Sequence, residues 1–181
     1  MGLAVDQIAW FLAAFVAGGA LAQYPVGWLA DKYDRRWVLI WLSVASLLSS
    51  ALTALTGDLG MAGVLMTATL FGATTFPIYS VAAAHAHDFA ETSERVELSA
   101  ALMFFFALGA IEAPLMASTL IELYGPSAMF VMIGAGHAAL VVFGLIRMQT
   151  GPRASRRTRY IWAPRTSFLI GRLIGRARDE D

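Results

Sequence analysis

Residues 31–36 hold the densest group of ionisable side chains in the first half of the chain. They include two carboxylates and three cations: Asp31, Lys32, Asp34, Arg35 and Arg36. Apolar stretches of the length needed to cross a bilayer stand on both sides, so these charges are expected in a tight loop at a membrane surface. A chance charged loop is one interpretation, and the spacing favours a functional motif over it.

A single carboxylate, Glu112, stands near the middle of a long apolar segment, two residues before Pro114. A charge at that depth costs roughly 2.5–3.5 kcal/mol on insertion scales, so this side chain is expected to face protein or a water-filled cavity. Two interpretations stay open. Glu112 takes part in proton coupling or cation recognition, or it is a neutral acid bonded to backbone groups that the proline leaves free.

Other polar groups lie inside or beside the apolar segments. Four of them either line a cavity or hydrogen-bond between helices, and the sequence favours neither: Gln23, Thr74, Thr75 and Tyr79. His85, His87 and Asp88 are expected at a helix end beside solvent, and no fourth ligand is evident, so no metal site is predicted. His137 is expected to be packed inside its helix and not catalytic.

The composition places these residues in a membrane protein. Hydrophobic residues make up 58% of the 181 residues and charged residues 14%, against roughly 45–50% and a quarter in soluble domains. A soluble core of this size could not bury so much apolar surface. The chain has no cysteine, which excludes disulfides and zinc–thiolate sites. The sequence contains neither a Gly-rich phosphate loop nor a nucleophile beside a base, so we expect no enzyme and no cofactor.

Five apolar segments are long enough to cross a bilayer core of about 30 Å as helices. They lie at about residues 8–30, 37–56, 59–84, 98–123 and 128–146. These segments are too long and too uniformly apolar for barrel strands. The expected fold class is therefore all-α: a polytopic membrane protein with a transmembrane bundle over residues 1–148. A basic tail over residues 149–181 is expected to be disordered, with contact to an anionic membrane surface as the alternative.

All thirteen Lys and Arg residues fall on one side of the predicted membrane. Three lie in the first loop, one in the third loop and nine from Arg147 onward. Positive residues stay cytoplasmic, which predicts an N-terminus outside and a C-terminus inside the cell. The same polytopic anchor argues against nucleic acid as a partner of the basic tail.

Small residues and prolines recur within the predicted spans. Two segments repeat small residues every four positions, which predicts close helix packing unless it reflects composition alone: Ala14, Gly18 and Ala22, then Gly134 and Ala138. Three segments contain a proline that is expected to kink its helix: Pro25, Pro77 and Pro114.

The charged loop resembles the signature loop of the major facilitator superfamily of transporters. That pattern is Gly-x-Leu-Ala-Asp-Arg/Lys-x-Gly-Arg-Arg/Lys, and residues 27–36 read Gly-Trp-Leu-Ala-Asp-Lys-Tyr-Asp-Arg-Arg. Asp34 replaces the second glycine; because Asp tolerates the left-handed conformation better than most residues, the turn is expected to survive. Further segments resemble the bacterial YcaD-like branch of the family: residues 23–27, 76–79, 84–86, 125–126 and 163–167.

The resemblance implies a partial major facilitator fold. Family members have about twelve helices in two pseudo-symmetric halves, and the matches fall on the second half, from the eighth helix to the twelfth. The chain is therefore expected to be a truncated or split transporter that lacks the first half and the seventh helix. The branch is bacterial, which implies the inner (plasma) membrane.

The resemblance also assigns roles to the loop, whose motif includes Gly27 and Lys32. The family's motif aspartate, here Asp31, faces a helix start in the opposite half and helps to lock the cytoplasmic gate. A motif arginine pairs with an acid at the end of a neighbouring helix. The matching acid is Asp88, so Arg35 or Arg36 is expected to approach Asp88, with Asp31 nearby. Glu112 is not part of the resemblance, because relatives usually carry an apolar residue there.

The resulting functional prediction is a secondary-active transporter that, when complete, moves an unidentified small solute by alternating access. Its expected partners are the lipid bilayer and that solute. The alternative is a non-transporting membrane interaction module, or a half-transporter that pairs with a separately encoded N-terminal half or a second copy.

Overall fold

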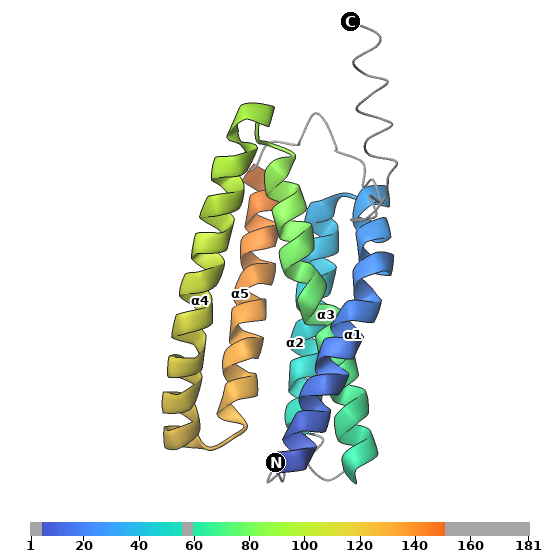
Figure 1. The fold of residues 1–181 in the computed structure, drawn as a ribbon, viewed down its shortest axis with the longest axis vertical. Coiled ribbons are helices and arrows are strands. Elements are labelled where there is room, and N and C mark those ends of the chain that lie inside the picture. Colours follow the sequence, from blue (N-terminus) through green and yellow to red (C-terminus); the bar gives the residue numbers. More distant parts are fainter. Residues whose placement is uncertain (1–4, 56–59, 151–181) are drawn as a thin grey trace, which may run out of the picture.

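Five long α-helices run side by side in the computed structural model, which describes residues 5–55 and 60–150 (Figure 1). They are α1 (Val5–Lys32), α2 (Arg35–Leu55), α3 (Gly60–His87), α4 (Arg95–Tyr124) and α5 (Ala128–Thr150), with a short 3-10 helix, η2 (Thr92–Glu94), before α4. All five are long and apolar enough to span a membrane. The predicted all-α, polytopic fold class is therefore confirmed.

The helix ends differ from the predicted spans by a few residues. α2 begins at Arg35, two residues before the predicted span. α5 continues to Thr150, past the predicted limit of the bundle at residue 148, and the helix breakers Gly151 and Pro152 follow in the sequence. The predicted basic tail lies almost entirely in residues 151–181, outside the described residues.

Helices adjacent in sequence are not always adjacent in space. α1 packs along α3, while α2 lies between α3 and α5 and barely touches α1. α4 stands at the edge, with limited contact to α5 and α3 (Figure 1). The bundle thus has a tightly packed part, made of α1, α2, α3 and α5, and one peripheral helix.

Two glycines bring α1 and α3 together. A Cβ added to Gly18 would collide with the backbone of Thr69, and one added to Gly72 would collide with the backbone of Phe15. The close packing predicted for the small-residue stripe is confirmed at Gly18, and Gly72 is its counterpart on α3. Small residues let helix backbones approach in lipid, where van der Waals contact replaces the hydrophobic effect as the driving force.

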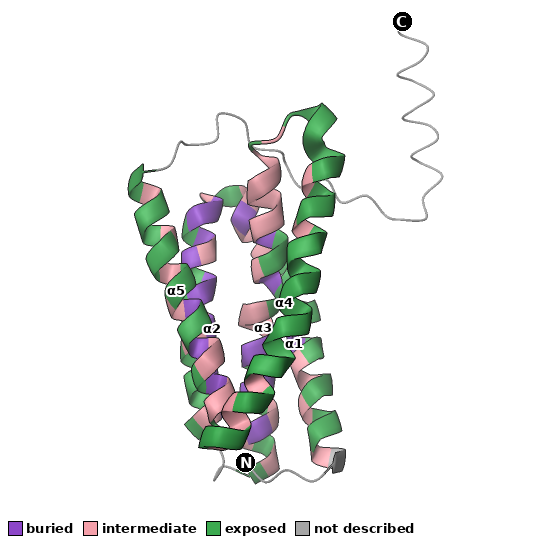
Figure 2. Cartoon of the chain, turned by 90° about the vertical axis from the view of Figure 1, so that its left-hand side faces the viewer, coloured by how far each residue is buried: buried purple, intermediate pink, exposed green. Residues whose placement is uncertain are grey.

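α2 is polar inside and apolar outside. Five of its buried residues carry hydroxyl groups: Ser43, Ser46, Ser49, Ser50 and Thr53. Its exposed large residues are all apolar and recur every three or four positions: Trp37, Trp41, Val44, Leu48, Leu52 and Leu55. Figure 2 shows the buried residues of α2 in purple. This pattern is the reverse of a soluble amphipathic helix, and it is expected of a helix whose exposed stripe meets lipid.

The chain alternates direction, so charged helix ends meet at one end of the bundle, the upper end in Figure 1. Among the described residues, every Lys and Arg lies at this end: Lys32, Arg35, Arg36, Arg95 and Arg147. The opposite end holds the turn between α4 and α5. There, Gly125 adopts a positive φ of 87° and its N–H donates to the carbonyl of Ile121.

Candidate gating site

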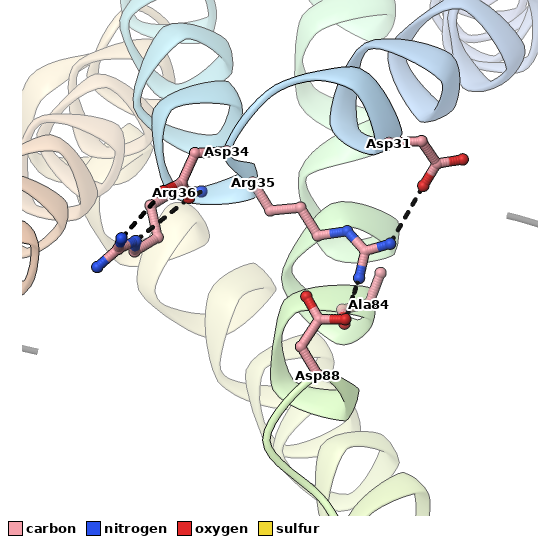
Figure 3. A network of polar contacts seen from close by, with 6 residues as sticks. All are labelled: Asp31, Asp34, Arg35, Arg36, Ala84 and Asp88. Carbon is pink, nitrogen blue, oxygen red and sulfur yellow. Dashed lines mark hydrogen bonds and ion pairs between the residues drawn. The ribbon is translucent and has the colours of Figure 1, made fainter. Parts of the chain in front are cut away.

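Arg35 joins the ends of three helices. Its Nη1 donates to Oδ1 of Asp88 at 2.6 Å and to the carbonyl of Ala84 at 2.9 Å, while Nη2 donates to Oδ1 of Asp31 at 3.1 Å (Figure 3). The side chains of Arg35 and Asp88 are only 5% and 3% exposed. One guanidinium group therefore connects the last turn of α1, the first turn of α2 and the end of α3.

Local structure explains this geometry. Asp31 precedes Arg35 by four residues, and the short connection between α1 and α2 turns the guanidinium toward α3. Ala84 lies in the last turn of α3, where carbonyl groups carry partial negative charge, and its carbonyl accepts the N–H of Asp88 at 3.2 Å as well as Nη1 of Arg35. An apolar cluster of Ala30, Val38 and Val81 is buried close by. Arg35 is thus held by a carboxylate on each side and by the dipole of α3.

The predicted contact between a motif arginine and Asp88 is present, and Arg35 makes it. Arg36 is also buried, but it turns to Asp34, with Nη2 at 2.9 Å from Oδ2. Both arginines of the motif are therefore paired with acids: Arg35 with Asp31 and Asp88, and Arg36 with Asp34.

Asp34 corrects one expectation. Among the described residues, no non-glycine residue has a positive φ, so Asp34 does not adopt the left-handed conformation expected at the pattern glycine. Instead its Oδ1 accepts the N–H of Arg36 at 3.0 Å, and its carbonyl accepts the N–H of Trp37 at 2.9 Å. Asp is a preferred N-cap because its side chain satisfies free N–H groups in the first turn. With Asp34 as its N-cap, α2 begins at Arg35, two residues before the predicted start at Trp37.

The other two motif residues lie outside this network. The ammonium of Lys32 sits 4.8 Å from the ring centre of Trp28 and 5.8 Å from that of Tyr33. A Cβ added to Gly27 would meet nothing within 4 Å, so packing within the described part of the chain does not require glycine there.

Comparison with known proteins agrees with the motif. The sequence profile of the Major Facilitator Superfamily matches residues 1–178. The chain belongs to the Major Facilitator Superfamily.

Its relatives in the family are bacterial. An uncharacterised MFS-type transporter of Yersinia enterocolitica is 30% identical over 146 residues, which are 81% of this chain and 37% of the relative. One from Yersinia pestis is 32% identical over the same shares. The uncharacterised MFS-type transporter YcaD of Salmonella paratyphi B is 32% identical over 74% of this chain and 34% of its own length. The chain thus spans little more than a third of the length of these curated relatives.

In this superfamily member, the four candidate cavity residues divide into two pairs. Thr74 Oγ1 lies 3.0 Å from Ser49 Oγ and Thr75 Oγ1 lies 3.4 Å from Ser46 Oγ, so both hydroxyls link α3 to α2. Thr74 and Thr75 thus make contacts between helices, and the cavity interpretation stays a prediction for them.

Gln23 and Tyr79 remain on the outer face of the bundle. Ser80 Oγ donates to Oε1 of Gln23 at 3.1 Å, which links α1 to α3. The hydroxyl of Tyr79 points to the sulfur of Met103 on α4 at 3.5 Å. Both side chains are exposed, so the cavity interpretation stays a prediction for them.

Glu112 is exposed on α4, and Pro114 lies inside the same helix, as predicted. The carboxylate therefore does not face the interior of these five helices, and its role stays a prediction.

The three histidines occupy separate environments. His85 packs edge-on against Phe89, with ring centres 5.2 Å apart, and His87 Nε2 lies 3.3 Å from Ser99 Oγ. Within the described residues, no group of three metal-ligating side chains comes together. His137 is 8% exposed on α5, as expected for a packed residue.

The hydroxyl face of α2 and the carbonyl of Ala84 were not among the residues predicted from the sequence. A signal for the first was available, because Ser43, Ser46, Ser50 and Thr53 follow the helical period. No residue type marks the second, since the acceptor belongs to the backbone.

Proposed function

We propose that these five helices are part of a secondary-active transporter that moves a small solute by alternating access, in which two helical units rock around a midplane site. The observation that carries this proposal is the buried bridge from Arg35 to Asp31 and Asp88. Rocking requires each unit to move as one body. A buried ion pair that joins three helix ends makes the cytoplasmic end of this unit rigid.

Asp31 would supply the variable contact of the gate. Its side chain is 26% exposed, whereas that of Asp88 is 3% exposed. Asp88 is therefore fixed inside the unit, and Asp31 has surface left to meet a helix start in an opposing unit. Such a start carries partial positive charge and favours a carboxylate.

The exposed face of α4 and a pocket at one end of the bundle supply the argument for opposing helices. Glu112 is exposed at mid-helix, and hydrocarbon is an unfavourable environment for it. At the end opposite the basic loops, an apolar pocket of about 290 Å³ is lined by residues of α1, α2, α4 and α5, including Phe11, Ile121 and Phe130. Further protein opposite α4 would give Glu112 a polar environment, and further apolar helix would fill the pocket.

The exposed face of α4 also supports a second candidate function. In α4 no residue is buried among the described helices, which favours a membrane module that pairs with a separately encoded N-terminal half, or with a second copy, without transporting. In that case helix pairing, and not solute movement, would be the function of the exposed face.

The proposed location is the bacterial inner membrane, with the basic end in the cytoplasm. The chain has no cysteine, so single cysteines give a clean labelling test. Ser93→Cys at the basic end should resist an impermeant maleimide in intact cells, and Ser127→Cys at the other end should react. The reverse pattern would contradict this orientation.

Transport is tested by expressing the chain in bacteria, alone and with the first seven helices of the Yersinia enterocolitica relative, and challenging the cells with a panel of toxic small solutes. Altered tolerance to a solute class, lost in Arg35→Ala and kept in Arg147→Gln, would support the proposal. Stable pairing of the two chains without any change in tolerance would favour the non-transporting module.

A further inference from the structure

An exposed aromatic cluster surrounds a lysine at the junction of α1 and α2. We call it the aromatic corner, and it consists of Trp28, Lys32, Tyr33, Trp37 and Trp41. Three of the rings contact one another: the ring centres of Tyr33 and Trp41 are 6.0 Å apart, and those of Trp37 and Trp41 are 6.3 Å apart. Trp28 joins the cluster through Lys32, whose ammonium lies 4.8 Å from its ring centre. Each ring is nonetheless 42–53% exposed. Large rings left this open in an ordered cluster indicate a surface that meets something other than water.

The corner presents one cation outward. The nearby acids are already bound to guanidinium groups: Asp31 and Asp88 contact Arg35, and Asp34 contacts Arg36. Lys32 is exposed and rests against the rings of Trp28 and Tyr33. An ammonium has three N–H donors, so the cation–π contact positions Lys32 while its exposed side leaves it accessible to a further acceptor.

The position of the corner identifies its surroundings. Trp37 and Trp41 are the first two members of the exposed apolar stripe that continues through Val44, Leu48 and Leu52 on α2. That stripe faces lipid, so the corner sits where hydrocarbon gives way to headgroups, the level at which Trp and Tyr concentrate. The occupant is therefore lipid and not a polar protein surface.

We propose that the aromatic corner binds an anionic phospholipid in the leaflet at the basic end of the bundle. Lys32 contacts the phosphate, and the rings of Trp28, Tyr33 and Trp41 pack against the glycerol and upper acyl region. Charge and geometry support this assignment: an outward ammonium meets a phosphate, and amphipathic rings meet the boundary between polar and apolar lipid. The site does not depend on whether the chain transports.

Tryptophan fluorescence provides the test. Trp10→Phe and Trp162→Phe in the full chain remove the tryptophans outside the corner and leave Trp28, Trp37 and Trp41. This parent is reconstituted in phosphatidylcholine vesicles that contain increasing fractions of phosphatidylglycerol or phosphatidylcholine labelled with a quencher near the headgroup. Half-quenching should need about five-fold less labelled phosphatidylglycerol than labelled phosphatidylcholine, the effect of one basic residue at an anionic surface.

Variants at Lys32 separate this site from general attraction to a basic protein. Lys32→Gln should remove the preference for phosphatidylglycerol, and Lys32→Arg should keep it. Arg147→Gln, an exposed basic residue at the same end, is the matched control and should also keep it. Equal quenching by both lipids in the parent would overturn the proposal. A preference that survives Lys32→Gln would overturn it too, because the attraction would then lie elsewhere.

Discussion

α2 and α4 are both long, apolar helices, but their side chains lie in opposite environments. Both are apolar enough to span a membrane. Seven of the ten buried residues of α2 are polar or charged. The guanidinium group of Arg35 and the hydroxyls of Ser49 and Thr53 find partners on α1, α3 or α2 itself. α4 has no residue buried among the described helices (Figure 2). It exposes a carboxylate at Glu112.

The two helices differ in how the hydrogen-bonding needs of their polar side chains are met: within the bundle for α2, and outside it for α4. In lipid, polar groups must be bonded within the protein. The bonded groups of α2 meet that requirement, and its exposed stripe is uniformly apolar. On α4 the carboxylate of Glu112 is exposed, and in the transporter that we propose further helices would surround it. Substitutions should therefore be severe around α2 and α3 and mild on α4.

Arg35→Ala should have the largest effect. It leaves Asp88, 3% exposed, as a buried carboxylate without its cation, which should lower the free energy of unfolding by about 3–5 kcal/mol. The thermal midpoint of the purified chain in mild detergent measures this, and Arg95→Ala at the exposed start of α4 is the control. An equal loss in both variants would contradict the contrast between the helices.

Gly72→Leu should have the second largest effect on stability. A side chain at this position would collide with the backbone of Phe15, so α1 and α3 would have to separate, at a loss of about 3 kcal/mol. Gly109→Leu on α4 is the matched control, because a Cβ there meets nothing within 4 Å. Expression level and thermal midpoint should fall only for Gly72→Leu. A similar fall for Gly109→Leu would show that α4 is packed more closely than it is here.

These two positions also show how far sequence reasoning reaches. Span length and the location of Lys and Arg predicted the five helices, because the bilayer imposes both rules on any sequence. The contact between Arg35 and Asp88 followed from the family motif. Gly72 was not singled out, because a lone glycine in an apolar helix carries no mark of which helix it will face.

Which helices pack against one another could not be predicted from the sequence, for a related reason. Uniformly apolar helices such as α4 have no amphipathic face to indicate which side is covered. Asp34 shows the limit of transferring a motif. The pattern glycine suggested a left-handed turn, but the aspartate forms an N-cap with Arg36, because its side chain offers a hydrogen bond that glycine lacks.

Removing a single hydroxyl should have a smaller effect. Thr74→Val abolishes the 3.0 Å contact with Ser49 on α2 while preserving side-chain shape. Hydrogen bonds between membrane helices contribute about 0.6 kcal/mol on average. Thr119→Val on α4 is the control, because its hydroxyl bonds only within its own helix, to the carbonyl of Leu115 at 3.0 Å. A modest drop in thermal midpoint for Thr74→Val alone would sharpen the contrast, and no difference would weaken it.

Glu112→Gln should change the stability of the isolated chain least, because the carboxylate is exposed on α4 and Gln keeps its size. The effect of Glu112→Gln should depend on whether further helices surround α4. When the chain is expressed with the first seven helices of the Yersinia enterocolitica relative, the opposing helices that we propose would surround this position, and neutralising it should alter the pH dependence of solute tolerance. Unchanged tolerance at every pH would remove the coupling interpretation and leave a neutral acid bonded to backbone near Pro114. A large loss of stability in the chain alone would instead mean that α4 meets its polar requirement within the bundle, and the contrast with α2 would fail.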